Sequence, residues 1–224
     1  MKELLKKLCQ PDNELRAHAL QAELSARNAA YECPENMAVV VPAAADEAVV
    51  LCAHYDVFPG SFGYNDNGMS LAIILSLLER LPGFVEVVFT NGEERGFLGA
   101  RHYLRHNRKK LLGCVNLDVC GFGDTVYCDP MNSGLEPAGS KIGPMPINDG
   151  CIFADHGIPA LTFSAGPGEV SFDEGIRRIG RTIHNGPLDN RLDVLNFGLA
   201  GLFGPVVLRT VGALSGTACP PRSE

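Results

Sequence analysis

Residues 84–106 read FVEVVFTNGEERGFLGARHYLRH, and this stretch sets the fold class. Residues 84–89, FVEVVF, are apolar except for one glutamate, which is typical of a strand covered on both faces of a sheet. Residues 96–110, GFLGARHYLRHNRKK, are predicted to form a helix whose basic last turn suits the helix dipole. A buried strand followed directly by a helix is typical of α/β folds.

The same alternation continues in both directions along the chain. Further strands are predicted over residues 37–41, 49–54, 114–120, 125–128 and 158–164, and further helices over 12–28, 69–81 and 192–214, the last bent at Pro205. Such a pattern indicates an α/β protein with a parallel or mixed sheet covered on both faces. With 224 residues, the chain is expected to form a single domain, residues 1–224.

Composition narrows the function classes. The formal net charge of −7 favours neither nucleic acid nor an anionic membrane as a partner. The apolar stretch 197–208 is too short to span a bilayer. None of the eight cysteines forms a CxxC pair, so a thiolate zinc site is not expected. Free thiols and the lack of a signal-peptide pattern at the first residues lead us to expect a cytoplasmic protein.

Ionisable residues follow the predicted strands. Two adjacent carboxylates, Glu93 and Glu94, repel each other at the end of a buried strand unless a cation compensates them. Ligands in α/β sheets bind at the carboxyl ends of strands. The candidates near these ends are His54, Asp56, Asp66, Glu93, Glu94, Asp118 and His184. Two histidines and several carboxylates that converge on one edge indicate a metal site with enough ligands for two ions.

Each residue alone also has an ordinary structural interpretation. The glutamate pair could be a solvated strand end, Asp66 a helix cap, and His184 a loop histidine. Cys52 and Cys120 share strand faces with His54 and Asp118, and we expect them to pack in the core.

Two further segments have less certain roles. The Pro- and Gly-rich residues 129–148 form a long loop without clear structure, of a kind that is often functional. Arg177, Arg178 and Arg181 are expected to be solvated, although one of them could pair with a substrate carboxylate.

Taken together, the ordered motifs AHYD, NDNG, NGEERGFLGARHY, NLDVCG and IHN resemble metallopeptidase family twenty-eight of clan MH, the di-zinc aminopeptidases. The resemblance covers about residues 49–190. It implies a three-layer α/β/α sandwich with a central mixed, mostly parallel sheet. It also implies two Zn²⁺ ions, for which Mn²⁺ or Co²⁺ could substitute.

The resemblance implies a role for each candidate. Asp66 would bridge the two ions; His54 and Asp118 would complete one ligand set, and Glu94 and His184 the other. The metal ligands are therefore His54, Asp66, Glu94, Asp118 and His184. Glu93 would be the general base, and Asp56 would orient His54. A cis peptide bond is expected between Asp66 and Asn67.

The implied function is that of a metallo-exopeptidase, an aminopeptidase that hydrolyses N-terminal residues from short peptides through a metal-bridging hydroxide. A dipeptidase, carboxypeptidase or small-amide deacylase on the same site, and a non-catalytic binding module, are alternatives. Family members that cyclise N-terminal glutamine use one zinc and a modified ligand set, which differs from the full set here. Residues 148–150, Asn-Asp-Gly, depart from the family's Ser-Asp-His pattern, so the substrate pocket is expected to differ more than the metal site. Oligomeric state is not predicted.

Overall fold

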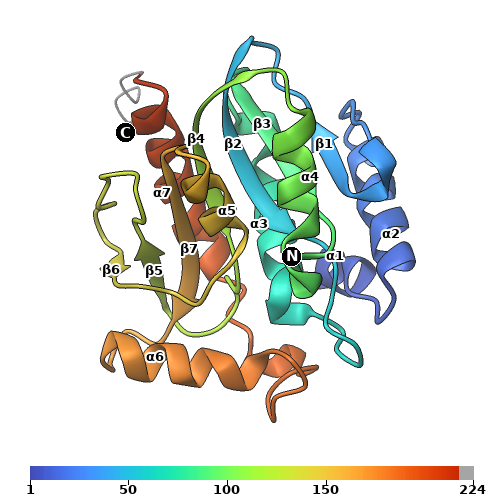
Figure 1. Cartoon of the computed structure of the whole chain (residues 1–224). Coiled ribbons are helices and arrows are strands. Elements are labelled where there is room, and N and C mark those ends of the chain that lie inside the picture. Colours follow the sequence, from blue (N-terminus) through green and yellow to red (C-terminus); the bar gives the residue numbers. More distant parts are fainter. Residues whose placement is uncertain (217–224) are drawn as a thin grey trace.

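The computed structural model describes residues 1–216, which form one seven-stranded sheet with helices on both faces (Figure 1). The helices are α1 (Lys2–Leu8), α2 (Asn13–Ala26), α3 (Met69–Leu77), α4 (Leu98–His106), α5 (Asp149–Asp155), α6 (Phe172–Ile179) and α7 (Leu199–Leu214). The strands are β1 (Ala38–Val41), β2 (Glu47–His54), β3 (Val85–Thr90), β4 (Lys110–Leu117), β5 (Thr125–Asp129), β6 (Lys141–Ile142) and β7 (Ala160–Gly166).

The strand order is β1-β3-β2-β4-β7-β5-β6. The four central strands, β3, β2, β4 and β7, run parallel, whereas β1 pairs antiparallel with β3 and β5 pairs antiparallel with β7. This topology confirms the mixed, mostly parallel sheet. Because the central strands are parallel neighbours, their carboxyl ends lie at the same edge of the sheet.

Two hydrophobic layers cover the sheet, which explains why the central strands are apolar on both faces. On β2, Val49, Leu51 and Ala53 belong to the core formed with α1, α2, α3 and α7. The alternate residues Val50 and Cys52 belong to the core formed with α4 and α5. Figure 1 shows α4 and α5 in front of the sheet and α3 and α7 behind it. The three-layer α/β/α sandwich is therefore confirmed.

Three predicted helices differ clearly from the structure at their ends. The helix predicted over residues 69–81 ends at Leu77 and is followed by the 3₁₀ turn η3 (Leu78–Arg80). The helix predicted over residues 96–110 ends at His106, and Lys110 already belongs to β4. Lys110 pairs with Glu47 on β2 and forms an ion pair with it at 2.7 Å, so a strand contact replaces the last helical turn. The helix predicted over residues 192–214 begins at Leu199, because Asn196 donates its backbone N–H to the carbonyl of Gly121 at 2.8 Å. Pro205 lies inside α7.

The cysteines within residues 1–216 are free thiols, and both Cys52 and Cys120 are buried, as expected for packing residues. Cys219 lies outside the described residues.

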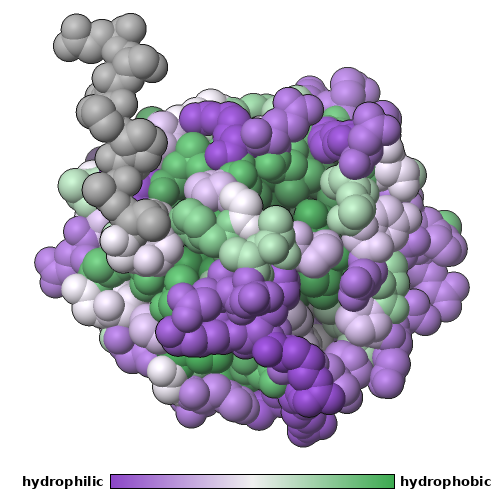
Figure 2. All heavy atoms as spheres, turned by 90° about the horizontal axis from the view of Figure 1, so that it is seen from above, coloured by the Kyte–Doolittle hydropathy of each residue, from purple (hydrophilic) through white to green (hydrophobic). Residues whose placement is uncertain are grey.

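No helix in the described part of the chain is both long and apolar enough to cross a membrane. At the end of the molecule away from α6, apolar residues are exposed among polar ones (Figure 2), as on ordinary domain surfaces.

Candidate metal centre

The parallel strands bring most of the predicted residues to one edge of the sheet. His54 is the last residue of β2, and Asp118 follows the end of β4. Glu93 and Glu94 lie in the short helical turn η4 (Glu93–Arg95), just beyond β3. Since β3, β2 and β4 are adjacent, these four side chains come together without any long connection.

Two further residues reach the same place from loops. Asp66 lies in the turn η2 (Tyr64–Gly68), directly before α3, and the peptide bond between Asp66 and Asn67 is cis, as expected. His184 follows the turn η5 (Gly180–Thr182) and has a positive φ of 50°.

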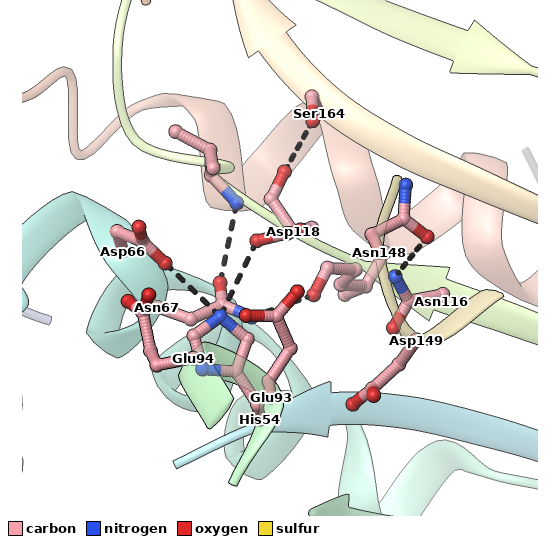
Figure 3. A network of polar contacts seen from close by, with 12 residues as sticks. His54, Asp66, Asn67, Glu93, Glu94, Asn116, Asp118, Asn148, Asp149 and Ser164 are labelled. Carbon is pink, nitrogen blue, oxygen red and sulfur yellow. Dashed lines mark hydrogen bonds and ion pairs between the residues drawn. The ribbon is translucent and has the colours of Figure 1, made fainter. Parts of the chain in front are cut away.

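The first group consists of His54, Asp66 and Asp118 (Figure 3). The Nε2 atom of His54 lies 3.0 Å from Oδ1 of Asp66 and 3.5 Å from Oδ1 of Asp118. The His54 and Asp66 side chains are only 3% and 8% exposed, so this group is largely shielded from water.

The second group consists of Asp66, Glu94 and His184. The Nε2 atom of His184 lies 3.3 Å from Oδ2 of Asp66 and 3.1 Å from Oε2 of Glu94. The His184 side chain is 48% exposed, and its ring contacts that of Phe58 with a centroid distance of 4.9 Å. Asp66 thus belongs to both groups and offers one oxygen to each.

Asp56 lies behind both groups and is fully buried. Its carboxylate accepts hydrogen bonds from the backbone N–H groups of Glu93, at 3.0 Å, and Glu94, at 3.2 Å. The backbone carbonyl of Asp56 lies 3.2 Å from Nδ1 of His54, and one of its carboxylate oxygens lies 3.5 Å from the same atom. The sequence predicts the position of Asp56 next to His54 but not its hold on the glutamate pair.

The electrostatics of the centre favour positive charge. Burial disfavours the charged form of His54, but the surrounding carboxylates, Asp118 first, outweigh burial and raise its pKa well above the ordinary value. Hydrogen bonds to Asp66 and Glu94 raise the pKa of His184 to about 10. Burial alone would raise the pKa of Asp66, but hydrogen bonds from both histidines hold it well below its usual range.

These donors fit divalent cations. The ligand atoms in each group lie within 4.8 Å of one another, and imidazole with carboxylate is a ligand set that suits zinc-like ions. Among the described residues of the two groups, two buried carboxylate oxygens accept no hydrogen bond: Oε1 of Glu94, and Oδ1 of Asp118, which has only the 3.5 Å ion-pair contact with His54. Unsatisfied buried carboxylate oxygens are costly, and a bound cation would satisfy them.

Glu93 faces the same centre but belongs to neither ligand group. Burial, together with the nearby carboxylates of Asp118 and Asp149 and against the lowering effect of His54, raises the pKa of Glu93 to about 9. A cation in either group would lower this pKa, because it favours the carboxylate form.

A buried polar layer that the sequence does not predict lies beside Glu93. Asp149 accepts a hydrogen bond from the Thr90 hydroxyl, and burial raises the pKa of Asp149 to about 7. Its neighbour Asn148 accepts hydrogen bonds from Asn116 Nδ2 at 3.1 Å and the Thr162 hydroxyl at 2.8 Å (Figure 3). The Asn-Asp pair before an apolar run, which here begins α5, was the available sequence signal.

A cavity of about 130 Å³ opens beside Glu93. Its apolar wall consists of Val119, Met145, Pro146, Ile147, Ile176, Ile179 and Ile183. Residues 145–148 close the long loop predicted over 129–148, so the end of that loop lines the cavity. The loop is pinned by Asp129, which accepts hydrogen bonds from Met131 N at 3.0 Å and Met145 N at 2.8 Å.

The arginines of α6 and η5 do not line this cavity. Arg177 forms an ion pair with Glu174 at 2.7 Å, and Arg178 forms ion pairs with Glu169 and Glu174, both at 3.0 Å. These contacts agree with the expectation of solvated surface charge.

Comparison with known proteins identifies the family of this chain. Residues 36–185 match the model of peptidase family M28. A vacuolar membrane protease of Candida dubliniensis is 39% identical over 83 residues, which is 34% of this chain and 9% of that protein. The chain therefore corresponds to a small part of that curated relative.

Solved structures share the fold. BSAP, a zinc aminopeptidase from Bacillus subtilis, superposes with a TM-score of 0.61 at 20% identity, over 79% of this chain and 49% of that chain. A glutaminyl cyclase from Porphyromonas gingivalis superposes with a TM-score of 0.68 at 17% identity, over 89% of each chain. At these identities the likeness concerns the fold, whereas the family match extends over most of the chain and over every motif from His54 to His184. The chain belongs to peptidase family M28.

Proposed function

We propose that this chain is a zinc-dependent metallo-exopeptidase, and more specifically an aminopeptidase that releases N-terminal residues from short peptides. The observation that supports this best is the pair of ligand groups that share Asp66, with Glu93 beside them and outside both. BSAP, a zinc aminopeptidase from Bacillus subtilis, has the same fold.

Two zinc ions are proposed, one for each group. His54, Asp66 and Asp118 would hold the first, and Asp66, Glu94 and His184 the second. When bound, the ions supply Lewis acidity, which polarises a peptide carbonyl and makes a water molecule more acidic. Mn²⁺ or Co²⁺ would fit similar ligands.

The protein residues divide the remaining work. Glu93 takes the proton of the attacking water and later delivers it to the leaving amine, because it is the carboxylate at the centre that neither ligand group uses. Asp56 fixes the backbone that presents Glu93 and Glu94, and it orients His54 through Nδ1.

The charges around the cavity favour an aminopeptidase over a carboxypeptidase or dipeptidase. Within residues 1–216, the side chains that line it include the acidic residues Asp66, Glu93 and Asp118 but no lysine or arginine. With the proposed zinc ions on Asp66 and Asp118, Glu93 is the carboxylate left to attract a free α-amino group, whereas a substrate carboxylate would find no lysine or arginine with which to pair. The apolar wall would take an aliphatic side chain of the N-terminal residue.

The other functions are less well supported. A small-amide deacylase would use the same centre without reading an α-amine. A glutaminyl cyclase is disfavoured because both ligand groups are complete, and a non-catalytic binding module is disfavoured for the same reason. We keep the cytoplasm as the proposed location, on the basis of the free thiols.

Hydrolysis of matched peptides by the zinc-reconstituted protein tests this function. The peptides share one sequence with an N-terminal leucine; one has free ends, one is N-acetylated, and one is amidated at its C-terminus. A fourth peptide begins with glutamine. Products are identified by mass spectrometry, and the Glu93→Gln variant is the control for contaminating peptidases.

Cleavage of the free and amidated peptides, but not of the acetylated one, is expected of an aminopeptidase. Loss of activity on the amidated peptide alone would favour a dipeptidase or carboxypeptidase. Cleavage of the acetylated peptide would favour a deacylase, and loss of ammonia from the glutamine peptide would favour a cyclase. Absence of all these activities in a protein that binds no zinc would favour the binding module.

A further inference from the structure

Asn65 lies directly before Asp66, the residue shared by the two ligand groups. It is 2% exposed, and both ends of its amide form hydrogen bonds with other segments of the chain. Each of these segments belongs to a different ligand group.

The amide oxygen of Asn65 reaches the segment that follows Asp118. It accepts a hydrogen bond of 2.7 Å from the backbone N–H of Gly121. The approach is so close that a Cβ atom on Gly121 would lie 2.8 Å from this oxygen. Because residue 121 is glycine, the segment that follows Asp118 can lie close enough to the turn η2 for this hydrogen bond to form.

The amide nitrogen of Asn65 reaches the segment that precedes His184. It donates a hydrogen bond of 2.7 Å to the hydroxyl of Thr182, which is 1% exposed. The Thr182 hydroxyl in turn donates to the carbonyl of Ile179 at 2.7 Å. Both hydrogen bonds of the Asn65 amide, to Gly121 and to Thr182, are buried, so water cannot easily replace either of them.

The two ligand groups differ in how firmly their histidines are supported. His54 ends a central strand, pairs with Thr90 on β3, and is buried. His184 lies in a loop, is 48% exposed, and has a left-handed backbone conformation. Its loop is held locally by Asn185 N, which donates to Asp189, and it is held toward the turn η2 through Thr182.

We propose that Asn65 is a positioning residue that aligns the two ligand groups, and that its hydrogen bond to Thr182 sets the affinity of the second group, Asp66, Glu94 and His184, for its metal ion. The proposal rests on the proposed function, because it assumes two ions. Loss of the bond frees the His184 segment relative to Asp66 but leaves His54 on its strand. Binding of the ion in the second ligand group should therefore be weakened, and binding of the ion in the first group should not.

The test is zinc binding by Thr182→Val, which replaces the hydroxyl by a methyl group of similar size. Titration against a fluorescent zinc chelator gives the two dissociation constants without any measurement of activity. We expect the dissociation constant of the second ligand group to rise about 10- to 100-fold, as for other supports of metal ligands. The dissociation constant of the first ligand group should change less than about 3-fold. Thr182→Ser, which keeps the hydroxyl, should restore the parental values.

Thr210→Val is a matched control, because Thr210 is also a buried threonine whose hydroxyl bonds a backbone carbonyl, that of Val206 in α7. It should leave both dissociation constants unchanged. If Thr182→Val does not fold, Thr182→Ala provides the same loss of the hydroxyl with a smaller side chain.

The outcomes separate this inference from the proposed function. If the parental protein binds fewer than two zinc ions, the proposed function itself fails. If it binds two, and the Thr182 variant that folds retains its second site or loses both sites equally, the inference is overturned, because the hydrogen bond then has no selective role.

Discussion

The carboxylate of Asp56 holds the backbone of Glu93, because its Oδ1 accepts the Glu93 N–H at 3.0 Å while Oδ2 accepts that of Glu94 at 3.2 Å. One buried side chain thus fixes the backbone of two consecutive residues with different proposed roles, Glu93 as general base and Glu94 as metal ligand. The same carboxylate lies 3.5 Å from His54 Nδ1. Asp56 is therefore the support shared by three residues of the centre.

Asp56→Asn is expected to lower kcat/KM by about 10- to 100-fold, as loss of such supporting carboxylates typically does. The amide removes the negative charge beside Nδ1 of His54, although the backbone carbonyl of residue 56 still contacts that atom at 3.2 Å, and it cannot accept both backbone hydrogen bonds equally well. Peptide hydrolysis and zinc titration measure the effect. Asp124→Asn is the control, since Asp124 accepts the Gly168 N–H at 2.7 Å on the exterior of the molecule. Equal effects of the two substitutions would contradict the role of Asp56.

Glu93→Gln is expected to lower kcat by at least about 100-fold, the lower range for loss of a general base. Zinc content should stay at the parental value, because Glu93 belongs to neither ligand group. Steady-state kinetics and metal analysis by mass spectrometry measure the two quantities on one preparation. Near-normal turnover would mean that another group moves the proton.

Asp66→Asn is expected to lose both zinc ions, whereas His184→Ala should lose only one, since Asp66 alone belongs to both groups. Metal analysis after dialysis against a weak chelator measures the stoichiometry. His156→Ala serves as the control, because His156 lies outside both groups and its ring contacts the carbonyl of Ile152. Retention of one ion by Asp66→Asn would show that the groups do not share this ligand.

Zinc binding is expected to release at least about one proton per ion near neutral pH, because an imidazole must be deprotonated before it can ligate and Glu93, with a pKa of about 9 before zinc binds, would lose its proton as well. The pKa of His184 is about 10, and that of His54 is also raised, so both hold their protons in the metal-free protein. Zinc affinity should therefore rise with pH up to these pKa values. Calorimetry in two buffers with different ionisation enthalpies measures the protons released. Identical heats in both buffers would contradict the elevated pKa of the histidines.

Asp149→Asn is expected to flatten the pH dependence of stability in the zinc-free protein. Burial raises the pKa of Asp149 from 3.8 to about 7. Between these values the folded state holds a proton that the unfolded state has lost, so stability falls as pH rises through this window. From pH 5 to pH 8 the loss due to Asp149 is on the order of 2 kcal/mol. Urea unfolding at both pH values compares the variant with the parent; equal pH dependence would show that Asp149 ionises normally.

The sequence predicts which side chains the fold brings together at this edge of the sheet, because strand ends and motif order are local signals. His54, Glu93, Glu94 and Asp118 each follow an apolar strand, and the parallel sheet then brings them together. What the sequence does not predict is support at a distance. The contacts from Asp56 to Glu93 and from Asn65 to Thr182 join segments whose spacing in the chain contains no signal.

The helices show a similar division. α6 was not predicted, although Ser171 and Glu174 have the spacing of a helix cap and the Ser171 hydroxyl accepts the Glu174 N–H at 3.3 Å. The premature end of α4 could not be predicted from propensity, because it depends on the pairing of Lys110 with a strand 63 residues earlier in the chain. Tertiary pairing overrode a favourable helical pattern there.

The position of His184 so late in the chain has a consequence for biosynthesis. Its two partners in the second group, Asp66 and Glu94, emerge from the ribosome long before it, and they cannot complete that group until His184 arrives. A nascent or truncated chain that lacks this histidine would have at most half of the centre. The order of the ligands thus delays assembly of the second ligand group until all seven strands of the sheet have been made.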